Sequence, residues 1–174
     1  MKKITLILMA FAASTIAFAQ NRQVDEFFKK YEGKEGYTSV MISEKLFELV
    51  ASAAPESEAE ITDMIGELQG IRVLVYDQED AYTKSAELYK EASSAISLDA
   101  FDELLTVYDE GDKVRLLVRQ DPANKEVINE LLILVSGDEF VLVDIFGQID
   151  LSKISKLADS MDIEGLDELK NLDK

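Results

Sequence analysis

The sequence has 174 residues, with 35 acidic against 18 basic side chains, a net charge of -17 at neutral pH, and neither histidine nor cysteine. These absences exclude Ser-His-Asp and Cys-His catalysis, thiol redox chemistry, disulfides, and metal sites built from imidazole or thiolate. The negative charge disfavours nucleic acid, which selects basic surfaces. We therefore expect no cofactor, no metal, no catalytic residue of these classes and no nucleic-acid partner.

Residues 1–19 have the pattern of a cleaved export signal. Lys2 and Lys3 precede a short apolar run that ends in Ala17-Phe18-Ala19, the small-x-small pattern of a signal-peptidase site. The run is shorter than the roughly 20 apolar residues that a membrane-spanning helix needs. We expect cleavage after Ala19, a periplasmic or secreted location, and no membrane anchor. Residues 20–174 have the length of a single domain.

The segment after the signal shows a helix, strand, helix pattern. Residues 24–31 carry apolar side chains at helical spacing, and Gly33 ends this helix. Residues 37–43 alternate as a strand with one buried face, and residues 44–54 have helical spacing after a capping Ser43. The side chains expected to face the core are Val24, Phe27, Phe28, Tyr31, Leu46, Phe47 and Val50.

A capping box formed by Ser57 and Glu60 predicts the next helix, with Gly70 as its terminator. Its apolar stripe would include Leu68. The run from Ile71 to Asp77 then predicts a strand, because it is short, apolar and β-branched.

Two further helices are predicted at residues 79–92 and 99–108, again from the spacing of their apolar side chains. From Lys113 the apolar period changes to two, which is typical of strands, and Gly137-Asp138 predicts a tight hairpin. The three strands expected in this part of the chain cover residues 113–120, 129–137 and 139–146.

The C-terminal part begins with Gly147, which allows a bend, and with Asp150, which can cap a final amphipathic helix from Leu151. Residues 162–174 are acidic and are expected to fray.

This element order predicts an α+β fold with about five mostly antiparallel strands. The core order is β-α-α-β-α-α-β-β-β, with helices layered mainly on one face and further helices at both chain ends. The first two strands are expected to be joined by a right-handed crossover.

Two features of the strands suggest a binding surface. Arg72, Arg115 and Arg119 share the outward parity of two strands, so they could form an anion-binding patch or pair locally with acidic neighbours such as Glu130 and Asp144. The last three strands are apolar on their second parity as well, so either a helix covers that face or it binds a partner, a subunit or a hydrophobic ligand. The candidate interaction patch consists of Arg72, Arg115, Arg119, Leu132, Leu134, Phe140 and Leu142.

Acid pairs such as Asp109 and Asp112 keep a carboxylate-dependent hydrolase open as an unfavoured alternative. Acidic pairs are expected throughout a chain with 35 acidic residues, and they carry little weight without geometry.

Three stretches, "FFKKYEGKEGYTSVMISEKLFELV", "LQGIRVLVYD" and "INELLILVSGDEFVLVDIFGQIDLSKISKLAD", resemble the family named domain of unknown function 4252. The resemblance runs from about Val24 to Asp159 and includes a Gly-x-Ile-Asp-Leu corner at Gly147 to Leu151. It implies a small exported protein of Gram-negative bacteria, with a hint of envelope signalling, and brings no catalytic motif. Family members with a lipoprotein cysteine are anchored, and this chain has no such cysteine.

The sequence thus favours an exported, non-catalytic interaction or regulatory module of the cell envelope that contacts a protein partner. The alternative is a periplasmic binder of an apolar or anionic small ligand, and the hydrolase ranks last. The oligomeric state is left open.

Overall fold

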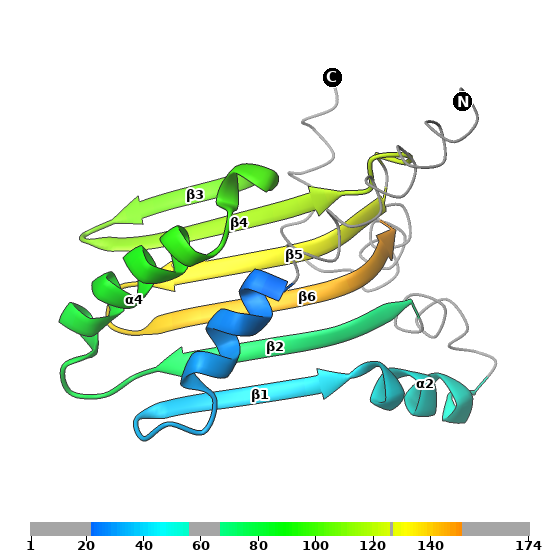
Figure 1. The fold of residues 1–174 in the computed structure, drawn as a ribbon, viewed down its shortest axis with the longest axis horizontal. Coiled ribbons are helices and arrows are strands. Elements are labelled where there is room, and N and C mark those ends of the chain that lie inside the picture. Colours follow the sequence, from blue (N-terminus) through cyan, green and yellow to red (C-terminus); the bar gives the residue numbers. More distant parts are fainter. Residues whose placement is uncertain (1–21, 56–66, 126, 151–174) are drawn as a thin grey trace, which may run out of the picture.

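The computed structural model describes residues 22–55, 67–125 and 127–150. They form an α+β fold, as the sequence predicts, built on one antiparallel sheet of six strands in the order β1-β2-β6-β5-β4-β3 (Figure 1). The strands are β1 (Tyr37–Ser43), β2 (Leu68–Tyr76), β3 (Asp102–Asp109), β4 (Asp112–Gln120), β5 (Val127–Ser136) and β6 (Phe140–Asp150).

Two helices lie over the same face of this sheet. The first covers residues 22–31 and is called the N-terminal helix here, and the second is α4 (Ala81–Ala95). Figure 1 shows both in front of the strands, whereas α2 (Glu44–Ala53) follows the end of β1 beside the sheet. A short 3-10 turn, η2 (Leu98–Ala100), connects α4 to β3.

The main core lies between these two helices and the sheet. The predicted stripe of the N-terminal helix is confirmed, because Val24, Phe27, Phe28 and Tyr31 are all buried. They pack with side chains from α4 and from every second position of the central strands. Buried members of this core include Leu74, Leu88, Ala92, Leu117, Leu132, Leu134, Phe140 and Leu142. We call this side of the sheet the helix face.

The predicted helix at residues 99–108 is wrong, because these residues form η2 and the edge strand β3. A register shift between Glu103 and Leu105 leaves Leu104 as an extra residue in the β3–β4 pairing. A bulge of this kind breaks the alternation of a strand. The apolar spacing of Leu104, Leu105 and Tyr108 therefore imitates a helix, although all three side chains are exposed.

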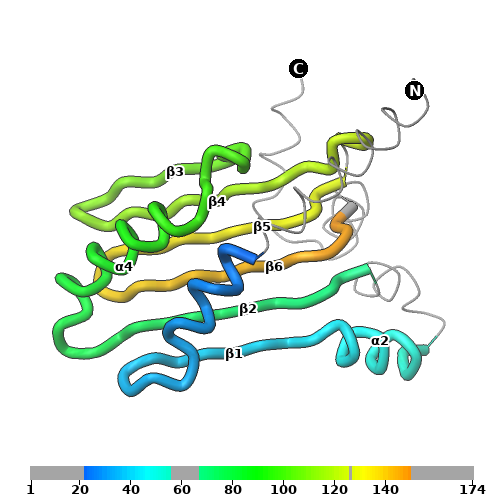
Figure 2. Tube along the Cα trace, in the orientation of Figure 1, coloured from blue at the N-terminus to red at the C-terminus, as the bar shows by residue number. Residues whose placement is uncertain are grey.

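The predicted crossover between the first two strands is also wrong, because β1 and β2 are antiparallel neighbours. Figure 2 shows them side by side at one edge of the sheet. β2 already begins at Leu68, so Leu68 belongs to no helical stripe and Gly70 ends no helix. The helix predicted between Ser57 and this point lies largely outside the described residues.

The burial expected for the first strand and the second helix is not found. No residue of β1 or α2 is buried, and Leu46 and Val50, expected to face the core, are exposed. Ser43 occupies the N-cap position of α2, but its side chain makes no capping hydrogen bond.

The predicted hairpin between the last two strands is confirmed, with Ser136 paired to Phe140 across a three-residue connection. Gly147 has a φ of 135°, and a β-carbon there would lie 2.6 Å from the backbone oxygen of Glu67. Only glycine fits where β6 bends against the start of β2, at a register shift in their pairing. The final helix expected after Asp150 lies outside the described residues.

Candidate functional site

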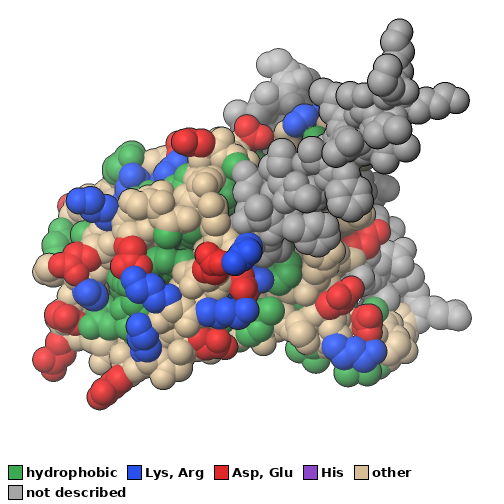
Figure 3. Space-filling view, viewed as in Figure 1, with side chains coloured by type: hydrophobic (Ala, Val, Ile, Leu, Met, Phe, Trp, Pro, Cys, Tyr) green, Lys and Arg blue, Asp and Glu red, His purple; other side chains and the backbone are tan. Residues whose placement is uncertain are grey.

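The residues of the predicted interaction patch lie on the helix face. Leu132, Leu134, Phe140 and Leu142 are completely buried, and Arg72 is nearly so. The sequence left two possibilities open for this parity: a covering helix, or contact with a partner, a subunit or a ligand. In the structure, helices cover it. Figure 3, which views the same side, shows basic and acidic side chains mixed over the outer surface of this layer. These buried side chains are therefore not available for contact with a partner.

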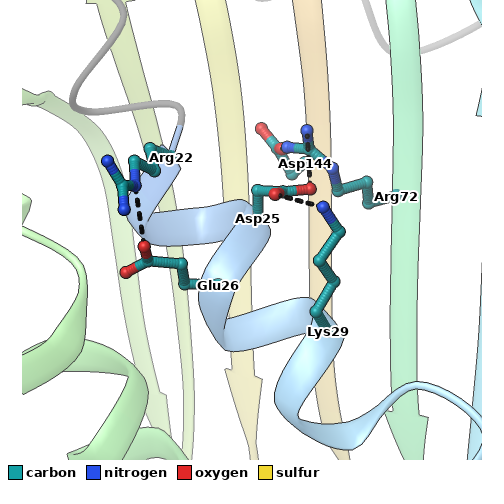
Figure 4. A network of polar contacts seen from close by, with 6 residues as sticks. All are labelled: Arg22, Asp25, Glu26, Lys29, Arg72 and Asp144. Carbon is teal, nitrogen blue, oxygen red and sulfur yellow. Dashed lines mark hydrogen bonds and ion pairs between the residues drawn. The ribbon is translucent and has the colours of Figure 1, made fainter.

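Arg72 is the centre of a buried ion network between β2, β6 and the N-terminal helix (Figure 4). Its Nη1 lies 2.6 Å from Oδ2 of Asp144, directly opposite on β6, and its Nη2 lies 3.4 Å from Oδ1 of Asp25 on the helix. Lys29, one helical turn further on, donates to the other oxygen of Asp25 over 2.7 Å. The network therefore ties the N-terminal helix to the centre of the sheet.

Local packing fixes the position of the Arg72 guanidinium. Its central carbon lies 4.2 Å from the ring centroid of Phe146, a stacking geometry that guanidinium groups favour on aromatic rings. The ring of Phe146 in turn occupies the space above Gly70, where a β-carbon would approach it to 2.4 Å. Gly70 is thus required by ring packing inside a strand.

The other two arginines of the predicted patch are also paired with acids. Arg119 on β4 forms an ion pair with Glu130, its register partner on β5. Arg115 lies 2.6 Å from Glu103 on β3. The interpretation of local pairing, which the sequence left open for these arginines, is confirmed for the Arg72–Asp144 and Arg119–Glu130 pairs.

The carboxylates of this network are the most deeply buried charges of the described residues. Asp144 and Glu130 have no exposed surface, and one oxygen of each, Oδ1 and Oε1, has no hydrogen-bond partner. Burial raises the pKa of Asp144 to about 6, although the nearby Arg72 opposes that shift. Burial also lowers the pKa of Arg119. The chain therefore carries a proton-sensitive carboxyl group under its N-terminal helix.

This arrangement is suited to holding structure together. Its cations and anions face one another beneath the helix. Within the described ranges, no group of three or more acidic side chains is placed to hold a metal ion. Asp109 and Asp112 pair across the β3–β4 hairpin, and both are exposed at its tip. They face solvent on a hairpin, so they form no cleft for the hydrolase alternative.

The opposite side of the sheet, which we call the aliphatic face, has a different composition. The strand register aligns its side chains in three rows across the sheet, and all positions except Thr38 and Asp102, which lie on the two edge strands, carry Val, Ile or Leu. The first row is Thr38, Val75, Val141, Val135, Val114 and Val107. The second is Val40, Val73, Val143, Ile133, Leu116 and Leu105. The third is Ile42, Ile71, Ile145, Leu131, Val118 and Asp102.

Among the described residues, no helix lies over the aliphatic face, since the N-terminal helix and α4 are both on the other side (Figure 1). Val40, Leu105 and Val107, towards the two edges, are 43%, 50% and 41% exposed. Most positions between them are partly exposed, and Val118 is buried in a small cluster with Ile128 and Ile149. An antiparallel sheet with a solvated face normally alternates apolar and polar residues, which this sheet does not.

The sequence predicts that both parities of these strands are apolar, but the predicted interaction patch lies on the covered parity. The two parities differ in charge, and this difference identifies the covered face only once the strand register is known. Every charged strand residue of the central network falls on one parity, whereas the other parity of the same strands is aliphatic through the middle of the sheet.

The profile of one protein family, described as Domain of unknown function (DUF4252), matches residues 31–157. The chain belongs to this family. No curated protein and no solved structure matches it. The match to DUF4252 includes all six strands, so both faces of the sheet lie within the family region. No helix of the described residues is both long and apolar enough to cross a membrane.

Proposed function

We propose that this protein is an exported, non-catalytic interaction module of the cell envelope, and that its aliphatic face is the surface that contacts a protein partner. The observation that carries the proposal is the three-row ladder of Val, Ile and Leu side chains without a described cover. Contiguous apolar surface of this extent on a soluble protein marks an interaction site. The export component rests on the signal pattern of residues 1–19.

The family match is compatible with an interaction role but assigns no activity. The buried charged side chains Arg72, Asp144 and Glu130 are engaged with one another or with neighbouring groups. The exposed feature that calls for an explanation is therefore the aliphatic face.

The alternative of a small ligand is less well supported. An anionic ligand would need free cations, and Arg72, Arg115 and Arg119 are each paired with a carboxylate. An apolar ligand would need a concave site that buries most of its surface. The aliphatic face is the side of a single sheet, and both the N-terminal helix and α4 lie on the other side (Figure 1).

Photo-crosslinking inside the producing bacterium tests the proposed surface. A photoreactive amino acid is introduced at Val143, at the centre of the aliphatic face, and separately at Tyr82, which is exposed on α4. We expect a discrete adduct of defined mass from Val143, identified by mass spectrometry, and none from Tyr82. Equal adducts from both positions, or none from Val143, would contradict the proposed contact surface.

Fractionation of the same cells tests the export component separately. We expect the protein in the periplasm or the medium, with Gln20 as its first residue because cleavage follows Ala19. A cytoplasmic protein that retains Lys2 and Lys3 would refute the export component and leave the contact surface to be judged from the crosslinks.

A further inference from the structure

We infer that the partner seated on the aliphatic face is a second copy of this chain, so that two sheets stack face to face in a symmetric dimer. This inference rests on the proposed function, because it assigns an occupant to the same surface. Three properties of the aliphatic face support the inference: its charge distribution, its size and the register of its side chains.

The charge of the protein restricts where two copies can approach. The chain has a net charge of -17, so most pairs of surfaces would bring like charges together. The three rows of the aliphatic face contain one charged side chain, Asp102, which lies at the end of the third row on the edge strand β3. Stacking these faces therefore places no acidic group at the centre of the contact. A cationic partner, by contrast, would be attracted to the acidic surfaces and would gain nothing from an uncharged one.

The size of the face is adequate for such a contact. Six strands about 4.8 Å apart, each contributing up to three residues at intervals of about 7 Å, give a surface of roughly 600 Å². Two such faces would bury about 1,200 Å² in total, which reaches the lower end of specific interfaces. Exposure extends to both edges, at Val40 on β1 and at Leu105 and Val107 on β3.

The shape of the surface is complementary to itself. Its side chains are short and mostly β-branched, and the register places them in regular rows across all six strands. Two twisted sheets of this kind pack with their inner side chains interdigitated and their layers about 10 Å apart. A two-fold axis between the layers would bring identical patches together, which is the commonest symmetry of soluble oligomers. The two polar positions, Thr38 and Asp102, lie on the edge strands, so the interior of the face requires no matching polar group on a partner.

Sedimentation equilibrium of residues 20–174, the chain without the predicted export signal, tests the dimer. We expect wild type to have twice the mass of one chain at micromolar concentration. Val143→Lys, which puts a charge at the centre of the face, should weaken association at least 100-fold. Val143→Thr keeps the β-branched shape, so it should stay folded and still weaken association about tenfold. Leu49→Lys, at a 54% exposed position on α2, is the matched control and should associate like wild type.

Combined with the crosslinks from Val143, each outcome has a defined meaning. A dimer that Val143→Lys and Val143→Thr weaken, with an adduct between two copies, supports the inference. A monomeric wild type with an adduct to a different protein overturns the dimer and retains the proposed function. A monomer without any intermolecular adduct, including one crosslinked to its own residues 151–174, overturns both. A dimer weakened by Leu49→Lys and unaffected at Val143 overturns the inference, because association would then use another surface.

Discussion

The helix face and the aliphatic face belong to the same six strands, yet they differ in where charge is placed. Beneath the helices lie Arg72, Asp144, Glu130 and Arg119, all with little or no exposed surface. The opposite face carries Val, Ile and Leu apart from Thr38 and Asp102 on the edge strands, and much of it is partly exposed. A protein that optimised only its own stability would distribute these residues the other way round, because buried charge is costly and exposed apolar surface favours association.

The comparison separates two roles. The helix face is suited to fixing the position of the N-terminal helix, because breaking a buried ion pair leaves an uncompensated charge. The aliphatic face adds little to the core of a single chain, so its composition is better explained by contact with another molecule. Substitutions on the two faces should therefore affect different properties.

The largest effect is expected from Arg72→Met, which leaves Asp144 buried without its cation. Loss of one partner of a buried pair costs about 3–5 kcal/mol of unfolding free energy, as measured by urea denaturation. Arg22→Met, which removes an exposed pair with Glu26, is the matched control and should cost less than about 1 kcal/mol. Similar costs for the two variants would mean that burial does not distinguish these ion pairs.

The next effect is expected from Leu142→Ala on the helix face, a position with no exposed surface. The lost burial and the remaining cavity should cost about 3 kcal/mol. Val141→Ala, the adjacent residue on the aliphatic face, should cost under about 1.5 kcal/mol in dilute protein. Equal losses in thermal or chemical unfolding would indicate that both faces are packed within one chain.

A smaller effect concerns pH. Burial raises the pKa of Asp144 from 3.8 to about 6, so the folded protein binds more protons than the unfolded chain between these values. The contribution of this group to stability should therefore increase by about 1 kcal/mol as the pH falls from 7 to 5. Asp144→Asn removes this dependence, and the difference between the two stability curves reports it. Parallel curves for wild type and variant would contradict the assignment.

The smallest effect on folding is expected from Val143→Thr. The substitution preserves shape on a partly exposed strand, so the unfolding free energy of dilute protein should change by less than about 1 kcal/mol. Its effect should appear in association instead. A large loss of stability in a chain that does not associate would show that the aliphatic face is already covered by the chain itself.

The fold class, most strands and the stripe of the N-terminal helix follow from apolar periodicity in the sequence. The errors have local causes. The bulge at Leu104 in β3 breaks the alternation on which strand prediction depends, so Leu104, Leu105 and Tyr108 imitate helical spacing. The antiparallel pairing of β1 with β2 spans a long connection, and chain order alone does not determine the direction of pairing.

The choice between the two sheet faces could not be made from apolar content, because both parities are rich in Val, Ile and Leu. Arg72 and Arg119 suggest an outward face when each strand is considered alone. Their partners Asp144 and Glu130 lie directly opposite on neighbouring strands. The ion pairs can therefore be recognised only once the strand register is known. Cross-strand pairing is therefore the information that the sequence lacked.

The most direct test of the contact surface uses a single cysteine, because the natural chain has none. Maleimide modification of Val143→Cys is measured in the native protein over a range of concentrations, with Leu49→Cys as the control. We predict that the rate at position 143 falls at least tenfold from dilute to concentrated protein, while the rate at position 49 stays constant. A rate at position 143 that is independent of concentration would contradict self-association through the aliphatic face.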